Sequence, residues 1–469
     1  MLEIDGVGMG VNWMRFLDET LDKPAPQVPQ TQAQTGSQTP AIPPQITVQV
    51  DANSDPSKPT NEDISAANTL IQTLAAQYQP PPPDITVDDP TTKAAQAAIQ
   101  DSQTQYDNAV ANQQTKLNTL TNLQSDPTAS AADLKNAQTD YDDAQTATTK
   151  AGRELEVTTD AGYMIAYAQQ ADSDKGAIAP AQTAADNAAT ALQKLMPGFD
   201  PKNPPPASAC KTPEQLGAYD TWQKADASLA KANSRYSADV ANSNLAYAQL
   251  QSHASDPDYS GAMNTSLTNL NNKLAPLGLE VSAPPAIDAS TAQTNLSSAA
   301  DDANYANACL SAASDASQVA DVQQTFDAVS GKFGPTVMTT TVAQQQDLLT
   351  RAQTAAQTSG GYLQMLSANR QVDQDQTDYN NALSASNQWH KANPDSQIVD
   401  PQVDRDVGDA YAKLTADQTQ AGLAHDSFVA AYGNSLASQY DDARTACRTS
   451  TTIARCVRST IRRRSKSRA

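Results

Sequence analysis

Apolar side chains recur at three- and four-residue spacing along most of the chain from Pro90 onward. This spacing puts them on one side of an α-helix and gives each helix a narrow apolar stripe. Short proline-containing breaks separate the runs, so consecutive helices can fold back on one another as antiparallel hairpins. The pattern therefore predicts an all-α protein, an elongated array of helical hairpins or slim bundles.

The helical pattern repeats along the chain. A tyrosine-led segment reaches an Asp-Pro pair 20 or 21 residues later in three places, residues 106–127, 236–257 and 379–401. A further shared element follows each segment, at residues 160–169, 302–311 and 426–435. Matches in the same order favour three related units. We predict helical units at residues 90–200, 207–335 and 336–443, the last of them incomplete.

The Asp-Pro pairs indicate where helices begin. An aspartate can accept hydrogen bonds from the first free N–H groups of a helix, and proline fits its first turn. The helix after each pair then carries a leucine among its apolar positions, Leu134, Leu267 or Leu414. The proline-containing breaks at residues 197–206 and 284–285 are predicted to be hinges between units.

The N-terminal part of the chain follows a different pattern. Residues 1–22 are predicted to contain a short helix, and residues 23–60, rich in Pro, Gln and Thr, a disordered linker. A helix and a proline linker should occupy residues 61–83. The β-branched runs at 46–50 and 85–87 are expected to be short extended arms, too short to build a sheet.

Composition limits what such helices can bury. The 39% hydrophobic content is largely alanine, and aromatic residues make up only 5%. Alanine contributes little apolar area, so burial requires thin helices packed closely side by side. This arrangement leaves no deep, water-free cleft for catalysis, and we predict no enzymatic activity.

The formal charge of −21 is unevenly distributed. Nine Lys and Arg residues and no acid fall in residues 444–469, which leaves 22 basic and 52 acidic side chains in residues 1–443. The acidic body should repel nucleic acid and anionic membranes. Residues 444–469 are either a basic tail that can contact nucleic acid or anionic lipid, or the product of a frameshift in a GC-rich gene. We favour the frameshift, in which case the natural protein continues and a functional module is missing.

Targeting signals are not evident in the sequence. The start, Met1-Leu2-Glu3-Ile4-Asp5, lacks a basic segment followed by an apolar run, so no signal peptide is predicted. No stretch approaches the roughly 18 apolar residues that a membrane span requires. We expect a cytoplasmic protein or one secreted by a leaderless route. The chain has four cysteines, Cys210, Cys309, Cys447 and Cys456. They form no CxxC pair and do not identify the cellular compartment.

Histidines and carboxylates offer few candidates for chemistry. His253, His390 and His425 are the only histidines, and none has a His or Cys at a metal-ligand spacing. His253 and His390 lie near predicted helix C-termini, where an imidazolium interacts favourably with the helix dipole. We prefer that structural role to one as a catalytic base.

Acidic clusters are candidates for metal or catalytic sites. Asp373, Asp375 and Asp378 resemble the start of a calcium loop, but Asp378 stands at its glycine position and Ser384 at its final glutamate position. We interpret the cluster as a solvated helix face. The side chains of adjacent acids on a helix point in different directions and cannot converge on one site. Three such pairs are therefore expected to serve solubility: Asp142-Asp143, Asp301-Asp302 and Asp441-Asp442.

The remaining motifs are also better explained by structure. Gly6, Gly8 and Gly10 lack the strand and βαβ unit of a dinucleotide site. Ser330-Gly331-Lys332 lacks the upstream glycine of a phosphate-binding loop. Trp222 and Trp389 lie on predicted helices and are expected to anchor packing. The sequence therefore predicts no catalytic, cofactor-binding or metal-binding residue.

Residues 90–443 resemble the Ala/Gln/Asp-rich helical regions of large Gram-negative bacterial proteins that accompany LysM-type peptidoglycan-binding or toxin modules. The resemblance lies in Tyr/Leu stripes and in an Asp-Pro before the next helix. It implies a structural or presentation role in an envelope-associated or secreted protein, with protein partners and a peptidoglycan or envelope context. No LysM module is present from which sugar-binding residues could be transferred.

The leading hypothesis is a non-enzymatic helical scaffold or interaction segment. The alternative is a leaderless secreted effector, suggested by the Ser/Thr/Gln/Pro-rich composition of residues 1–60. A third hypothesis, an enzyme built from dispersed carboxylates, has no positive support in the sequence.

Overall fold

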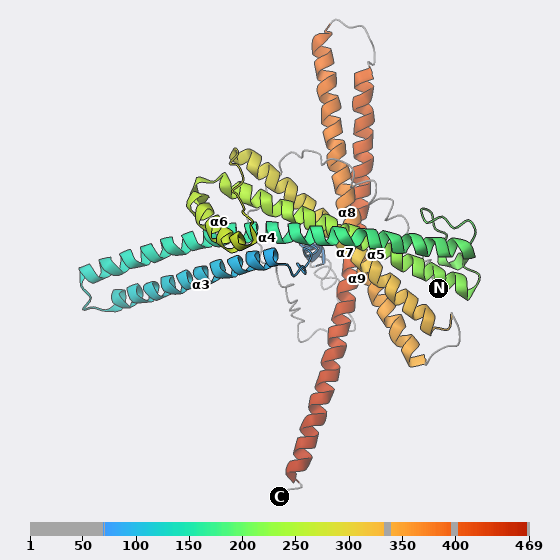
Figure 1. Cartoon of the computed structure of the whole chain (residues 1–469), viewed down its shortest axis with the longest axis horizontal. Coiled ribbons are helices and arrows are strands. Elements are labelled where there is room, and N and C mark those ends of the chain that lie inside the picture. The colour runs from blue at the N-terminus through green and yellow to red at the C-terminus, as the bar shows by residue number, and fades with distance from the viewer. Residues whose placement is uncertain (1–68, 70, 333–338, 395–401, 467–469) are drawn as a thin grey trace. The chain divides into compact units, whose positions relative to one another are not determined.

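The computed structural model describes residue 69 and residues 71–332, 339–394 and 402–466, with side chains up to residue 436. These residues form long α-helices joined by short loops and 3-10 turns, and no strand occurs among them (Figure 1). The predicted all-α fold is therefore confirmed. The predictions for residues 1–60 lie outside the described residues, as does most of the predicted helix that begins at residue 61. The effector alternative depends on residues 1–60 and stays a prediction.

The chain divides into two compact units. Among the described residues, unit 1 contains residues 80–314, and unit 2 contains residues 69, 71–79, 315–332, 339–394 and 402–466. The division falls inside one helix, whereas the repeat places its boundaries at the proline-containing breaks. The division into three units stays a prediction.

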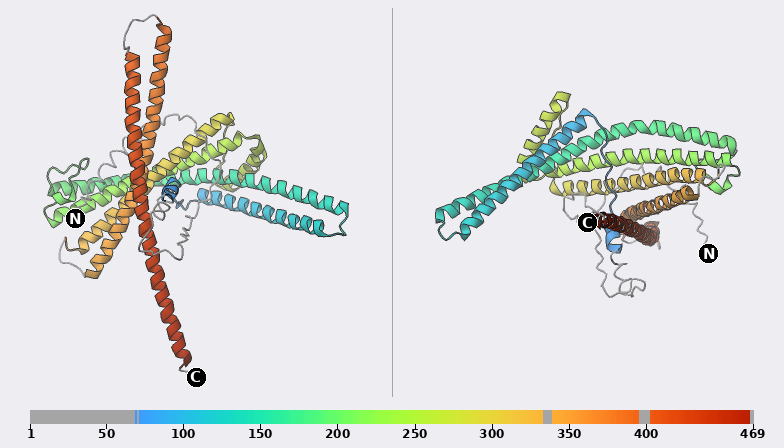
Figure 2. Two further views of the ribbon diagram at one scale, coloured as in Figure 1. Left: turned by 180° about the vertical axis from the view of Figure 1, so that it is seen from behind. Right: turned by 90° about the horizontal axis from the view of Figure 1, so that it is seen from below.

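Unit 1 is built from layered antiparallel helices. They are α3 (Pro90–Ser125), α4 (Ala131–Leu195), α5 (Pro213–Ala254), α6 (Ser260–Leu274) and the first part of α7 (Ala289–Val329). α3 and α4 lie side by side in every view, and α5 then returns along the second half of α4 (Figure 2). Helix α6 packs against α3 and α4.

The core of unit 1 lies where α3, α4, α5 and α6 meet. Alanines of α3 admit the larger side chains of α4 and α6, among them Val157 and Leu270, both fully buried. A second cluster closes the α4–α5 turn with Leu192, Phe199 and Trp222. The ring of Phe199 meets that of Trp222 edge-on at 4.9 Å. The predicted hinge at residues 197–206 is thus a hairpin turn inside unit 1.

Helix α4 runs without interruption for 65 residues. It begins with a capping box, in which Ser130 accepts from the Asp133 N–H and Asp133 accepts from the Ser130 N–H. Pro180 lies within the helix, a position that normally removes one backbone hydrogen bond, yet the helix continues. At 1.5 Å per residue its length is about 97 Å.

The first 20 residues of α4 pair with α3 to form what we call the α3–α4 arm, residues 103–125 and 131–150. Its inward residues alternate at three- and four-residue spacing while all their neighbours are exposed. On α3 they are Tyr106, Ala109, Gln113, Lys116, Leu120 and Leu123, and on α4 Leu134, Ala137, Tyr141, Ala144 and Thr148. The arm is therefore held by one narrow seam.

The Asp-Pro pairs lie near the starts of helices, but not all of them cap the long helix that follows. Asp89 does cap α3, accepting from the Thr91 and Thr92 N–H groups at 2.7 and 3.1 Å. Asp126, in contrast, accepts from the Thr128 N–H in a turn, and the cap of α4 is Ser130. Asp256 likewise caps a 3-10 turn ahead of α6. Asp126 and Asp256 satisfy the nearest free N–H groups, and in both places the long helix starts only after the chain has turned. Asp400 lies outside the described residues.

Unit 2 contains the end of α7 and an antiparallel hairpin of α8 (Thr339–Ala392) and α9 (Gln402–Lys466). Its aromatic core joins Tyr78 to Tyr362, Phe428 and Tyr432, with ring centroids 4.8 to 5.5 Å from that of Tyr78. Gly361 lets α8 approach α9 closely, since an added Cβ would lie 3.3 Å from the Phe428 Cα.

Glutamine and aspartate one turn apart support the helices in both units. In each pair the glutamine Nε2 donates to the aspartate Oδ four residues later, which stabilises a helix locally. Such pairs include Gln103–Asp107, Gln138–Asp142, Gln170–Asp174, Gln182–Asp186, Gln323–Asp327, Gln371–Asp375, Gln374–Asp378 and Gln402–Asp406.

Candidate functional site

Two helices of unit 1 bring four polar side chains together. Gln170 and Asp174 lie one turn apart on α4, and Arg235 and Asp239 lie one turn apart on α5. A four-residue step keeps both members of each pair on the same face of their helix. Because α4 and α5 are antiparallel neighbours, the two faces meet. We call this group the unit 1 cluster.

Asp174 is the charged centre of the unit 1 cluster. Its Oδ2 accepts from Arg235 Nε at 2.8 Å and from Gln170 Nε2 at 2.9 Å. Asp239 is fully buried beside it, and neither of its oxygens receives a hydrogen bond from any fixed donor. An ionised carboxylate in such a place would be strongly destabilising.

Asp239 is therefore best accommodated as a neutral acid. Burial, reinforced by the nearby Asp174 carboxylate and only partly offset by Arg235, raises the pKa of Asp239 to about 8. Its proton is donated to Asp174, so that the two side chains share one proton and one negative charge. Arg235 neutralises that charge.

The unit 1 cluster also holds the segment that precedes α3. We call residues 83–87 the strap. The Thr86 and Val87 N–H groups donate to Gln170 Oε1 at 2.9 and 2.8 Å. Arg235 donates to the Asp84 carbonyl and to Thr86 Oγ1, both at 3.1 Å. The strap is not paired with any strand, so these side chains satisfy backbone groups that would otherwise need water.

Unit 2 contains a similar group on α8 and α9, the unit 2 cluster. Gln371 Nε2 donates to Asp375 Oδ1 at 2.8 Å, and Lys413 Nζ lies 2.6 Å from the same oxygen. The Asp375 carboxylate is buried, with 1% of its side chain exposed, and Asp417 donates a hydrogen bond to it. Burial opposes ionisation of Asp375, but the hydrogen bonds from Lys413, Asp417 and Gln371 outweigh it and lower its pKa.

The interpretation of Asp373, Asp375 and Asp378 as a solvated helix face is wrong for Asp375. Asp373 and Asp378 are exposed on α8, but Asp375 faces α9. The error arises because the partner lysine is 38 residues away in sequence. Helical periodicity along α8 alone does not reveal it.

Two histidines lie in the last turn of a helix, as predicted, and each contacts an aspartate of the neighbouring helix. His253 of α5 is 3.0 Å from Asp160, and His390 of α8 is 3.0 Å from Asp404. Burial raises the pKa of Asp160, against the effect of His253. His425 lies within α9, 3.4 Å from the adjacent Asp426.

His253 belongs to a wider polar group at the meeting of α4, α5 and α6. Its ring stacks on Tyr259 at 4.3 Å, and the Tyr259 hydroxyl donates to Glu156. The Arg153 guanidinium lies 5.4 Å from the centroid of the Tyr259 ring and pairs with Asp258 at 2.8 Å. Each acid of the group has a partner: Asp160 contacts His253, Glu156 accepts from Tyr259, and Asp258 pairs with Arg153.

An open cleft of about 300 Å³ adjoins this group, lined by Thr146, Thr149, Lys150, Arg153, Asp258, Gly261 and Ala262. Its two basic residues lie close to acids, Lys150 at 3.7 Å from Glu154 and Arg153 at 2.8 Å from Asp258. Within the described ranges, no three His, Cys, Asp or Glu side chains are grouped so that they could hold a metal ion.

The structure also places the other residues considered from the sequence. Trp222 is buried against Phe199 and Tyr219, which agrees with a packing role, whereas Trp389 is half-buried and meets the His390 ring edge-on. Lys332 follows α7 and binds Asp327 at 2.6 Å.

The structure describes the side chains in only some of the acidic pairs, and it describes no residue of the glycine motif. Asp142 and Asp143 are exposed on α4, as is Asp301 on α7, and Asp302 is half-buried. The side chains of Asp441 and Asp442 and the whole of Gly6, Gly8 and Gly10 lie outside the described residues. Neither Cys210 nor Cys309 forms a disulfide.

Sequence reasoning missed the unit 1 cluster, although one signal was present. In the tyrosine-led repeats, the third residue after the tyrosine is Ala109 in the first and Ala382 in the third. In the second repeat that position is Asp239. An acid where related helices have a half-buried alanine indicates a carboxyl group on an inward face.

Comparison with known proteins adds no relative, since the chain matches no family model, no curated protein and no solved structure. Among the described residues, no helix is both long and apolar enough to cross a membrane.

Proposed function

We propose that the chain is a non-enzymatic helical scaffold or interaction segment whose protein partners bind along its helix faces. The observation that carries this proposal is the α3–α4 arm, two long helices joined by a single narrow seam. A two-helix hairpin of this kind leaves most of each helix surface available to a third helix. The envelope-associated or secreted setting rests on the resemblance of residues 90–443 described above.

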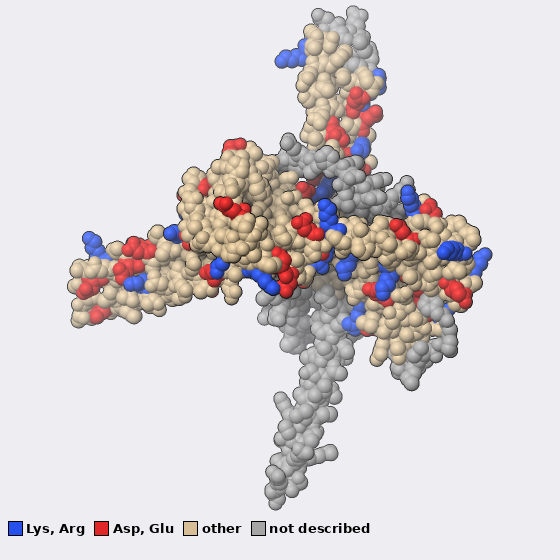
Figure 3. All heavy atoms as spheres, in the orientation of Figure 1, with Lys and Arg blue, Asp and Glu red and all other residues tan. Residues whose placement is uncertain are grey.

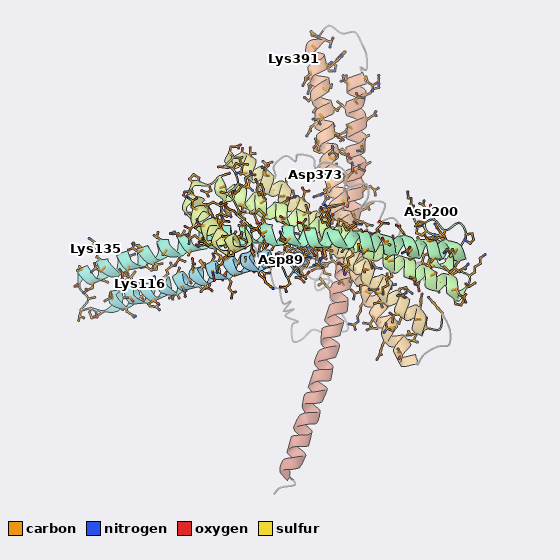
Figure 4. All side chains as sticks on the ribbon, viewed as in Figure 1. Asp89, Lys116, Lys135, Asp200, Asp373 and Lys391 are labelled. Carbon is orange, nitrogen blue, oxygen red and sulfur yellow. The ribbon has the colours of Figure 1, made fainter. Side chains whose placement is uncertain are left out.

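The surface of the arm supports binding of a protein rather than a polyanion. Acidic and basic side chains are interspersed along it (Figure 3), and its two helices carry Lys116 and Lys135 among aspartates (Figure 4). Val110 and Leu117 lie beside the seam on α3, two turns apart, with 40% and 36% of their surface exposed. The i, i+7 spacing matches the contacts that a helix makes with a neighbouring helix.

Rigidity is the first property that such a scaffold requires. Spin labels on cysteines at the exposed positions Gln145 and Gln182 of α4, in a chain whose four native cysteines are serines, should lie about 55 Å apart. A narrow distance distribution is expected. Ala168→Pro, at an exposed position between the two labels, should broaden it. A broad distribution well below that distance in the unbroken chain would count against the proposal.

Partner binding is the second property. A photo-crosslinking amino acid at Val110, in the cell that naturally makes the chain, should give one discrete adduct that Leu117→Asp removes. The matched control is the same amino acid at the exposed polar position Gln145. Equal adducts at both positions, or none at Val110, would contradict binding at the arm.

A further inference from the structure

The strap depends on the same two side chains that hold Asp174. Gln170 uses its Nε2 for Asp174 and its Oε1 for the strap amides, and Arg235 uses its Nε for Asp174 and a terminal nitrogen for the strap. A change in the charge or hydrogen bonding of Asp174 and Asp239 therefore alters the contacts that Gln170 and Arg235 make with the strap.

One proton completes the hydrogen bonds of the carboxyl pair. Asp174 Oδ2 has two donors from fixed groups, while the fully buried Asp239 has none for either oxygen. If that proton leaves, two carboxylates share one guanidinium at a site where 17% of the Asp174 side chain is exposed and Asp239 is fully buried. The free-energy cost of this second negative charge falls if the Arg235 side chain rotates to bridge both carboxylates, or if α4 and α5 separate and admit water. Both responses take Arg235 away from Asp84 and Thr86.

We propose that Asp174 and Asp239 form a proton-binding site that fastens the strap to the α4–α5 hairpin, so that loss of the proton releases the strap. The charged and titratable groups that face the pair are Arg235 of α5, Tyr167 of α4 and Asp84 of the strap. Burial raises the pKa of Tyr167 to about 12, so Tyr167 stays neutral when Asp239 ionises. Its hydroxyl donates to the Pro83 carbonyl at 3.4 Å.

Hydrogen exchange of the Thr86 and Val87 amides in the full chain tests the proposal. Both amides donate to Gln170 Oε1, so exchange reports directly on attachment of the strap. After correction for the intrinsic rate, protection should fall as the pH rises toward about 8, because the attached strap holds the proton up to that pH and the released strap gives it up earlier. The slope should not exceed about tenfold per pH unit, the limit for one proton, and protection should level off at higher pH.

Asp239→Asn is the decisive variant because the amide keeps the shape of the side chain and can donate to Asp174 at every pH. Strap protection in Asp239→Asn should be the same at pH 7 and pH 9. The matched control is Asp226→Asn, since burial raises the pKa of Asp226 on the same helix to about 7. Asp226→Asn should keep the fall in strap protection.

Two further measurements prevent an ambiguous result. Gln170→Leu should lower strap protection at all pH values, which shows that the assay reports the strap. Amides around Leu192, in the buried cluster at the α4–α5 turn, should stay protected at pH 9. A constant wild-type protection, an unchanged fall in Asp239→Asn, or an equal loss around Leu192 would each overturn the proposal.

Discussion

The unit 1 and unit 2 clusters have the same residue spacing along their helices, but a different carboxyl group is buried in each. Each has a glutamine four residues before an aspartate on one helix, and a cation four residues before an aspartate on the next. In unit 1 the fully buried acid is Asp239, which the cation does not contact, and its pKa rises. In unit 2 the buried acid is Asp375, which Lys413 contacts at 2.6 Å, and its pKa falls. The position of the cation relative to the buried carboxyl decides whether that carboxyl is neutral or charged.

The largest expected effect is an opposite pH dependence of the two units. Folded Asp239 keeps its proton up to about pH 8, whereas an unfolded aspartate loses it near 3.8. Its contribution to unit 1 is thus full below pH 3.8 and is lost as the pH rises to 8, by an amount on the order of 5 kcal/mol. Asp375 has a lowered pKa, so its contribution to unit 2 is present above pH 3.8 and is lost as the pH falls.

Tryptophan fluorescence during urea unfolding separates the two units. Trp222 lies in unit 1 and Trp389 in unit 2, so each can be kept as the reporter while the other and Trp13 become phenylalanine. We expect the Trp222 midpoint to fall between pH 6 and 9 and the Trp389 midpoint to fall between pH 5 and 3. Parallel profiles would mean that the two clusters do not differ as described.

A smaller effect is expected when the cation of the unit 2 cluster is removed. Lys413→Met leaves the Asp375 carboxylate buried without a counter-charge, and unit 2 should lose about 2 kcal/mol of stability. The figure is below that for a fully buried pair because 56% of the Lys413 side chain is exposed. Lys391→Met, at an exposed position of the same hairpin, is the control in urea unfolding followed at Trp389. Equal midpoints for the two variants would contradict a charged Asp375.

The smallest effect concerns the two histidine–aspartate pairs. His253 and Asp160 have 20% and 14% of their side chains exposed, whereas His390 and Asp404 have 52% and 36%. His253→Gln should therefore destabilise unit 1 by about 1 kcal/mol, because it removes the imidazole that contacts a largely buried acid and stacks on Tyr259. His390→Gln should change unit 2 much less. Thermal unfolding at pH 6 measures both, and a larger loss for His390→Gln would contradict the role given to burial.

Local patterns in the sequence predicted the features that depend on local structure. The stripes of Tyr, Val and Leu predicted long helices from Pro90 onward, and α3 does begin at Pro90. The caps predicted at Asp126 and Asp256 were displaced, because both residues turn the chain before the next helix begins.

Features that depend on pairing between helices were not predicted. Arg235 contacts Asp174 across 61 residues of sequence, and Lys413 contacts Asp375 across 38. Periodicity identifies the inward face of a helix but not the residue that it meets. Only Asp239, an acid at an alanine position of the repeat, gave a sequence signal for the unit 1 cluster.

The glutamine–aspartate pairs within the helices have a consequence for the response to salt. An amide donor carries no charge, so added electrolyte weakens these bonds far less than it weakens glutamate–lysine pairs. The same electrolyte screens the mutual repulsion of a chain with a formal charge of −21. Rising ionic strength should therefore stabilise these helices, whereas it would destabilise a protein that depends on surface ion pairs.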